Sequence, residues 1–186
     1  MSFGRLLRSL YLRYWSQPAA DRTLYKAIQS HPIRSIVELG IGLEERTQRI
    51  LEICLWHHRG EPLRYTGIDL FEARSAGQGR LSLKEAFSRL RLPGVRVQLV
   101  PGDPHVALRQ VANSLAATDL LLIAADQDRE SLMRAWPWMP RMLSPASLVF
   151  QEEAAAKVIP RHWRKLNVDD VQKLAAQSGK SLRRAA

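Results

Sequence analysis

The sequence predicts an α/β fold in which helices cover both faces of a mostly parallel sheet. Short apolar segments of strand length alternate with amphipathic segments of helix length along most of the 186 residues. The segment 119–124 is nearly continuously apolar, as expected for a central strand that is buried on both faces. Gly40 and Gly42 follow the first strand segment, and a glycine turn here is typical of folds that lead a strand directly into a helix.

Two helices are expected before the first strand, over 3–15 and over 19–29. Five large side chains line one side of the first helix at helical spacing: Phe3, Leu6, Leu7, Leu10 and Tyr14. The arginines of this helix avoid that side. We expect the apolar side to pack on the domain or on another subunit. The segment around Pro18 should end the first helix, and Pro32 the second.

Alternating strands and helices are expected after these two helices, which makes the fold Rossmann-like. The strands are predicted over 33–39, 65–70, 95–100, 119–124 and 147–151. Helices are predicted over 43–58, from Ser82 as N-cap to Pro93, from 104 to 115, and over 128–142 with Asp128 as N-cap. Prolines should distort the end of the last helix, in which Trp136 and Met139 are expected to be buried.

The predicted helices and strands, together with the distribution of charge, divide the chain into three segments. We expect an N-terminal helical extension over 1–32, a Rossmann-like domain over 33–153 and a basic, mainly helical tail over 154–186. The formal net charge is +10, yet residues 31–153 carry 15 basic and 15 acidic side chains. Residues 1–30 carry five basic side chains and one acidic, and the tail carries eight and two. The positive charge therefore lies at the two ends of the chain.

The basic ends indicate either an anionic partner or a solvated surface. Nucleic acid, an anionic membrane and an acidic protein would each suit them. Trp163 lies among basic residues at 161–165, a mixture that can contact nucleic acid or anchor the tail on the domain. The tail also holds a weak strand signal at 157–159 and a helix start at 167–170 that should end at Gly179. The oligomeric state stays open.

Composition disfavours membrane-spanning and disulfide-rich proteins. No apolar run approaches the roughly 20 residues that a membrane-spanning helix needs. The N-terminus lacks the compact apolar stretch of a signal peptide. Cys54 is the one cysteine, so no intrachain disulfide can form. We therefore expect a cytoplasmic protein.

Acidic residues stand at the predicted carboxyl ends of the strands, where doubly wound sheets bind their ligands. Glu38 precedes the glycine turn, whose following helix offers free N–H groups to an anion. Asp69 ends the second strand, where a carboxylate can accept hydrogen bonds from ribose hydroxyls or cap a turn. Asp103 follows the third strand and can accept an amino group of a base, cap the next helix, or both. Asp126, after the fourth strand, can act as a base, bind a metal or cap a helix.

Taken in order, these strand ends resemble the class I S-adenosylmethionine-dependent methyltransferases over 33–153. The resemblance implies a cofactor site for S-adenosylmethionine made by five residues: Glu38, Gly40 and Gly42 at its methionine part, Asp69 at its ribose and Asp103 at its adenine. It also implies methyl transfer by in-line displacement to an acceptor that the sequence does not identify. Asp126 is the candidate catalytic residue.

Several positions depart from the pattern of this family. Glu44 stands where a third glycine is usual, and its charge would repel the carboxylate of the cofactor unless Arg46 compensates. Ala124 and Gln127 replace the aspartate and histidine with which some members bind a divalent metal, so no metal site is expected. The terminal β-hairpin should be missing or reduced.

These departures support an alternative function, that of a binding or scaffold protein that keeps the methyltransferase-like fold without catalysis. The basic ends of the chain would associate such a protein with RNA. A nicotinamide-dependent enzyme is disfavoured, because the position of Glu38 is usually apolar in such sites.

Overall fold

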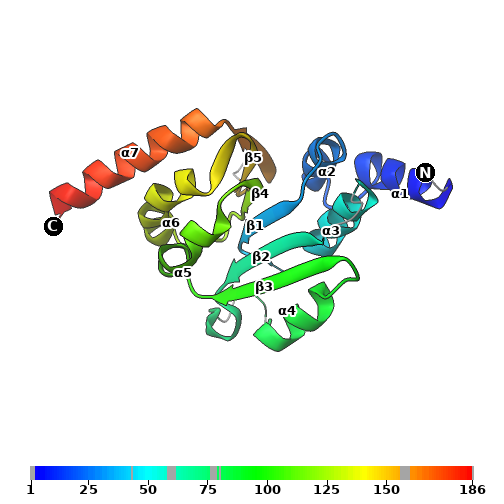
Figure 1. Ribbon diagram of the computed structural model, residues 1–186, viewed down its shortest axis with the longest axis horizontal. Coiled ribbons are helices and arrows are strands. Elements are labelled where there is room, and N and C mark those ends of the chain that lie inside the picture. The colour runs from blue at the N-terminus through cyan, green and yellow to red at the C-terminus, as the bar shows by residue number, and fades with distance from the viewer. Residues whose placement is uncertain are drawn as a thin grey trace.

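The computed structural model describes residues 3–42, 44–57, 62–75, 79, 81–155 and 160–185. Within these residues, six strands form one mixed sheet in the order β3-β2-β1-β4-β5-β6, with helices on both faces (Figure 1). The first five strands are parallel, and β6 is antiparallel to β5. The predicted α/β fold with a mostly parallel sheet is therefore confirmed. Among the described residues, no helix combines the length and apolar character that crossing a membrane requires.

Strands and helices alternate along the chain. The strands are β1 Ser35–Leu39, β2 Leu63–Asp69, β3 Val95–Pro101, β4 Thr118–Ile123, β5 Leu143–Glu153 and β6 His162–Leu166. The α-helices are α1 Phe3–Tyr14, α2 Asp21–Gln29, α3 Glu45–His57, α4 Leu83–Leu90, α5 Pro104–Val111, α6 Arg129–Ala135 and α7 Val168–Ala185. Short 3₁₀ helices are η1 Phe71–Ala73, η2 Ala112–Leu115 and η3 Trp136–Arg141.

Alternate residues of the central strands fill two hydrophobic cores, one on each face of the sheet. Ile36 of β1 and Leu120 of β4 belong to the core that α2, α3 and α4 cover. Val37 and Leu121, the next residues, belong to the core that α5, η3 and α7 cover. Successive side chains of a strand point to opposite faces. A helix layer on each side therefore explains why β4 is apolar without interruption.

Local sequence signals set several helix boundaries. Ser82 caps α4, Asp103 caps α5 and Asp128 caps α6, each through a side-chain oxygen that accepts a backbone N–H. The prolines interrupt the helix that the sequence predicts over 128–142, and its second half is the 3₁₀ helix η3. Trp136 and Met139 in η3 are buried, as predicted.

The C-terminal tail contains a strand that the sequence analysis did not predict. In the antiparallel pair of β5 and β6, Trp163 lies opposite Glu152. Trp163 is buried, and its Nε1 donates a hydrogen bond of 3.0 Å to Asp21 of α2. The tail is thus anchored on the domain through Trp163. The strand signal at 157–159 lies outside the described residues.

Helix α7 continues past Gly179 to Ala185, so the predicted end at Gly179 is wrong. A glycine ends a helix when it adopts a left-handed conformation, which Gly179 does not. Within a helix it costs only about 1 kcal/mol relative to alanine, and polar and basic residues that tolerate a helix follow it in the sequence.

Helix α1 packs on the domain through the side opposite to its apolar side. All of α1 is described, and Leu12 is its one buried residue. The Ser9 carbonyl accepts a hydrogen bond of 3.3 Å from Gln29 of α2. By contrast, Phe3 is 75% exposed and Leu7 is 52% exposed. Of the two expected placements of the apolar side, packing on the domain is therefore wrong.

Candidate functional site

The carboxyl ends of β1 and β4 lie side by side at the centre of the sheet. The chain moves from β1 to β2 and β3 on one side and resumes at β4 on the other, so the strand order reverses here. The Ala124 N–H donates a hydrogen bond of 2.8 Å to the Leu39 carbonyl and aligns the two ends. Doubly wound sheets bind ligands in front of such a reversal. We therefore place the candidate site at this edge, next to the Gly40 turn.

Three of the described residues in the turn after β1 have a left-handed backbone. The φ angle is +85° at Gly40, +66° at Gly42 and +62° at Glu44. Glycine adopts such angles without strain, whereas residues with a Cβ rarely do. Glu44 thus keeps the backbone conformation that a third glycine would have. Its carboxylate is buried and pairs with Arg89 at 3.1 Å, so the replacement changes the side chain but preserves the turn.

Glu38 lies beneath the glycine turn, in the core. The residue has no exposed surface. Its Oε2 accepts hydrogen bonds from the Thr47 hydroxyl at 2.7 Å and the Tyr65 hydroxyl at 2.8 Å. Its Oε1 accepts one from Arg46 at 3.1 Å. Burial raises the pKa of Glu38 above its ordinary value, against the lowering by Arg46, Thr47 and Tyr65.

Arg46 connects Glu38 to the edge of the sheet. Its Nη1 lies 3.6 Å from Glu152 on β5, and its Nη2 also donates to the Gly40 carbonyl at 3.3 Å. The guanidinium carbon stands 4.9 Å from the ring centroid of Trp163. Arg46 therefore holds together the glycine turn, β5 and β6.

Asp69 and Arg74 form a buried ion pair at the end of β2. Arg74 donates to both carboxylate oxygens of Asp69 at 2.7 Å each. The backbone N–H groups of Ile41 and Phe71 donate to the same two oxygens at 2.8 Å and 3.1 Å. Arg74 also donates to the Gly42 carbonyl at 3.0 Å. From the described residues, the carboxylate thus accepts four hydrogen bonds, about as many as its lone pairs allow.

The carboxylates after β3 and β4 differ in how they are held. Asp103 is partly buried and accepts hydrogen bonds from the Ser131 hydroxyl and from the N–H of His105. Of its two predicted roles, helix capping is therefore confirmed. Asp126 is exposed and accepts a hydrogen bond of 2.9 Å from Gln127.

Among the described residues, two hollows border the end of β4. The first, about 280 Å³ in volume, we call the Asp69 hollow; it is lined by Asp69, Leu70, Arg74, Asp103, Pro104 and residues 126–128. The second, about 260 Å³, we call the Arg46 hollow; its lining includes Gly42, Arg46, Asp126 and Glu152. Asp126 lines both. A Cβ on Gly40 would collide with the side chains of Ala124 and Gln127, so these side chains fill the space directly in front of the turn.

Solved structures of methyltransferases have the same architecture. No protein-family model and no curated protein sequence matches this chain. A structure of a putative rRNA methylase from Clostridium thermocellum has a TM-score of 0.55 at 10% identity, covering 89% of this chain and 81% of its own. A cofactor-bound protein from MTB has a TM-score of 0.53 at 15% identity, with 95% and 74% covered. A TDP-rhamnose 3′-O-methyltransferase of calicheamicin biosynthesis has a TM-score of 0.52 at 16% identity, with 95% and 86% covered.

The chain has the class I methyltransferase fold. At identities this low, the comparison shows the fold alone. Within the described residues, one antiparallel strand, β6, stands where the sequence analysis expected a missing or reduced hairpin.

The methyltransferase fold brings together four of the six predicted site residues. Asp69, Asp103 and Asp126 line the Asp69 hollow, and Gly42 and Asp126 line the Arg46 hollow. Glu38 lies below the turn, and Gly40 is covered by neighbouring side chains.

Sequence reasoning missed the neighbours that cover these residues. Arg74 and Gln127 occupy the space in front of Asp69 and Gly40, and both belong to loops whose conformation has no periodic sequence signal. The charge pattern offered one hint, since Arg74 lies only five residues after Asp69. The fold of the loop decides whether such a pair forms.

Acid is expected to weaken the fold through Asp69 and Asp103. Burial alone would raise the pKa of Asp69, but hydrogen bonds from Arg74, Ile41 and Phe71 hold it below the ordinary 3.8. Burial likewise opposes the hydrogen bonds that lower the pKa of Asp103.

These carboxylates therefore stabilise the fold fully above the pKa of 3.8 that they have in the unfolded chain. Their contribution is lost as the pH falls through that value toward the folded pKa, because the unfolded chain binds protons first. We expect the urea midpoint to decrease between about pH 5 and about pH 3, and Asp69→Asn to decrease less over the same interval. An equal decrease in both proteins would contradict this assignment.

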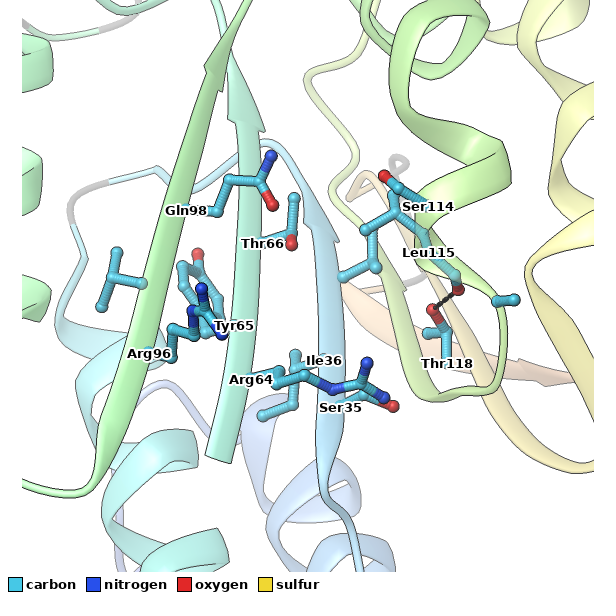
Figure 2. Close-up of a pocket in the computed structure, with 13 residues that line it drawn as sticks. Ser35, Ile36, Arg64, Tyr65, Thr66, Arg96, Gln98, Ser114, Leu115 and Thr118 are labelled. Atoms are coloured by element: carbon cyan, nitrogen blue, oxygen red, sulfur yellow. Dashed lines mark hydrogen bonds between the residues drawn. The ribbon is translucent and has the colours of Figure 1, made fainter. Parts of the chain in front are cut away.

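A larger cavity lies away from the carboxyl edge, on the face of the sheet near the amino ends of β1 to β3. It has a volume of about 340 Å³. Thr66 and Gln98 project into it from β2 and β3, and Ser114 and Leu115 lie across from them (Figure 2). Because ligands of this architecture bind at the carboxyl ends of the strands, we assign the candidate site to the two hollows and not to this cavity.

Proposed function

We propose that this protein is an S-adenosylmethionine-dependent methyltransferase and that it binds its cofactor along the carboxyl edge of the sheet. One observation carries the proposal. Carboxylates at the carboxyl ends of three strands, Asp69, Asp103 and Asp126, line one hollow beside a glycine turn, in a methyltransferase fold. The left-handed backbone of Glu44 supports it, since the turn keeps its shape where the third glycine is absent.

The residue types at this edge suit each part of the cofactor. Asp69 would accept the ribose hydroxyls and Asp103 the adenine amino group. The glycine turn, with Gly40 and Gly42, would lie against the methionine part. Glu38, which the resemblance assigns to that part, would act there by holding Arg46, whose guanidinium can receive a carboxylate. When bound, the cofactor supplies an activated methyl group for in-line displacement.

Asp126 is the residue that we propose as general base. It is exposed and lines both hollows, so it can reach an acceptor that enters from solvent. A carboxylate in hydrogen-bond reach of an acceptor hydroxyl or amine can remove its proton as the methyl group is transferred. The likeness to a putative rRNA methylase and the basic ends of the chain make RNA the first acceptor class to test.

Two side chains have to move before the cofactor can bind. Arg74 donates to both carboxylate oxygens of Asp69, which would have to accept the ribose hydroxyls. The Gln127 side chain covers Gly40. The residue types therefore fit the cofactor, whereas the described conformation is closed. The measured affinity of a protein that must first open is its intrinsic affinity reduced by the populated fraction of the open state.

Calorimetric titration with S-adenosylhomocysteine tests the proposal. We expect the unmodified protein to bind with a Kd on the order of micromolar and Asp69→Ala to lose binding. Arg74→Ala should bind at least about tenfold more tightly, because it frees Asp69 without cofactor-driven opening. Arg134→Ala is the matched control, since it breaks an exposed ion pair with Glu130 on α6, outside both hollows and away from the glycine turn, and should leave the affinity unchanged.

A second candidate function is that of a methyltransferase-like binding protein without catalysis. The ion pair between Arg74 and Asp69 favours this second function. If the cofactor site had been lost, an internal partner such as Arg74 would be expected in the place of the ribose. In that case neither the unmodified protein nor Arg74→Ala would give heat or thermal stabilisation with S-adenosylhomocysteine. That result would reject the cofactor proposal and leave RNA binding through the basic ends as the activity to measure, by its steep dependence on salt.

A further inference from the structure

The first helix presents an apolar surface to solvent. Among the described residues, eleven large hydrophobic side chains are exposed, and seven of these belong to α1 or the residue after it: Phe3, Leu6, Leu7, Leu10, Tyr11, Tyr14 and Trp15. We call these seven side chains the α1 stripe. A contiguous apolar patch on a surface helix marks an interaction site. Figure 1 shows α1 at one end of the molecule, beyond α2 and α3, so a large partner can approach the helix.

Positive charges border the α1 stripe. At 3.6 residues per turn, Arg8 and Arg13 lie on opposite sides of the stripe, roughly 90° to 130° from its centre. Lys26 of α2 stands 5.4 Å from the ring centroid of Tyr14. Of these three cations, Arg8 alone pairs with a carboxylate among the described residues, that of Glu52 at 3.3 Å.

Residues 1–30 contribute no exposed acidic side chain that would offset these charges. Asp21 is the one acidic residue within 1–30, and it is 2% exposed, bonded to Trp163. With Arg8 paired to Glu52, Arg13 and Lys26 leave the border of the α1 stripe with a net positive charge, so its partner should be apolar at the centre and anionic at the border.

We propose that α1 lies on an anionic phospholipid membrane, with the α1 stripe in the interface and Arg8, Arg13 and Lys26 at the headgroups. Helices that lie in a membrane surface have this arrangement, with an aliphatic and aromatic face and basic residues at its borders. A second copy of the chain suits the helix less well, because its own stripe has the same cationic border. RNA would use the cations but would leave the three leucines of the stripe without a partner.

Flotation with lipid vesicles tests the proposal on the full chain. The protein should float with phosphatidylcholine vesicles that contain phosphatidylglycerol and stay behind with phosphatidylcholine alone. Leu7→Glu with Leu10→Glu should reduce partitioning at least about tenfold, since each leucine loses its apolar burial. The matched control is Phe87→Glu with Met133→Glu, which adds the same charges at exposed apolar positions of α4 and α6 and should partition nearly as the unmodified protein.

Removing the border charges should also weaken binding. We expect about a fivefold reduction in partitioning for each cation lost in Arg13→Gln and Lys26→Gln. Raising the salt concentration should have the same effect. All substituted side chains are exposed, so circular dichroism should show the native fold in every variant.

Four results would overturn the proposal. One is equal partitioning on the two kinds of vesicle, and another is no partitioning on either. A third is a dimer by light scattering that Leu7→Glu with Leu10→Glu converts to a monomer, which would assign the α1 stripe to a second copy. The fourth is binding to single-stranded RNA, but not to vesicles, that the arginine variant loses and the leucine variant keeps.

Discussion

Replacing Glu38 with alanine is expected to lower the free energy of unfolding by about 3–5 kcal/mol, as for other buried ion pairs that lose one partner. The carboxylate is fully buried and accepts hydrogen bonds from Arg46, Thr47 and Tyr65. Without it, the Thr47 and Tyr65 hydroxyls lose their acceptor inside the core. Arg46 would keep the weaker contacts with Glu152, the Gly40 carbonyl and the Trp163 ring. Urea denaturation followed by circular dichroism measures the change.

Tyr65→Phe is the matched control for Glu38→Ala. It removes one hydroxyl that donates to Glu38 and leaves Arg46 and Thr47 in place. Because a hydrogen bond to a charged group contributes about 1.5–3 kcal/mol, its effect should be clearly smaller. If Glu38→Ala lost no more stability than Tyr65→Phe, the network around Glu38 would not hold the glycine turn.

Trp163→Ala is expected to lower the free energy of unfolding by a comparable amount, about 3–5 kcal/mol, since a buried tryptophan leaves a large cavity. Trp163 is 5% exposed. Its ring stacks with Arg46 at 4.9 Å, and its Nε1 donates to the buried Asp21 at 3.0 Å. The substitution would therefore separate β6 from both α2 and the Arg46 hollow. Chemical denaturation of the full chain gives the value.

Two variants separate the contributions of Trp163. Trp163→Phe keeps an aromatic ring but leaves Asp21 without its donor, and should cost about 1–3 kcal/mol. Trp15→Ala removes a tryptophan that is 65% exposed and should change the stability by less than about 0.5 kcal/mol. Equal stability of Trp163→Ala and Trp15→Ala would mean that β6 does not anchor the tail.

The two positions show different limits of sequence reasoning. The sequence predicts that Glu38, before the glycine turn, belongs to a site, but no local pattern pairs it with Thr47 of α3 and Tyr65 of β2. For Trp163 the sequence allows contact with nucleic acid or anchoring of the tail, and the hydrogen bond from its Nε1 to Asp21 of α2 shows that it anchors the tail. The basic segment that forms β6 has little strand propensity of its own. It becomes a strand because it pairs with β5 at the edge of the sheet.

The amphipathic first helix shows the same limit in another way. Helical spacing correctly predicted the helix and its apolar side, since both depend on residues three and four positions apart. The direction of that side depends on what else covers the domain. Leu12, on the opposite side, packs into the core, and the stripe that the sequence made most apolar faces outward.

The sequence by itself determined the alternation of strands and helices, the parallel sheet, the caps at Ser82, Asp103 and Asp128, and the acidic residues at the strand ends. These features depend on local periodicity and on short-range hydrogen bonds, which neighbouring residues encode. Only the tertiary structure decided that Arg74 pairs with the Asp69 carboxylate, that the Gln127 side chain covers Gly40 and that β6 pairs with β5 at the edge of the sheet. Those contacts join loops and strands whose relative positions depend on the packing of the whole domain, and no local pattern specifies them.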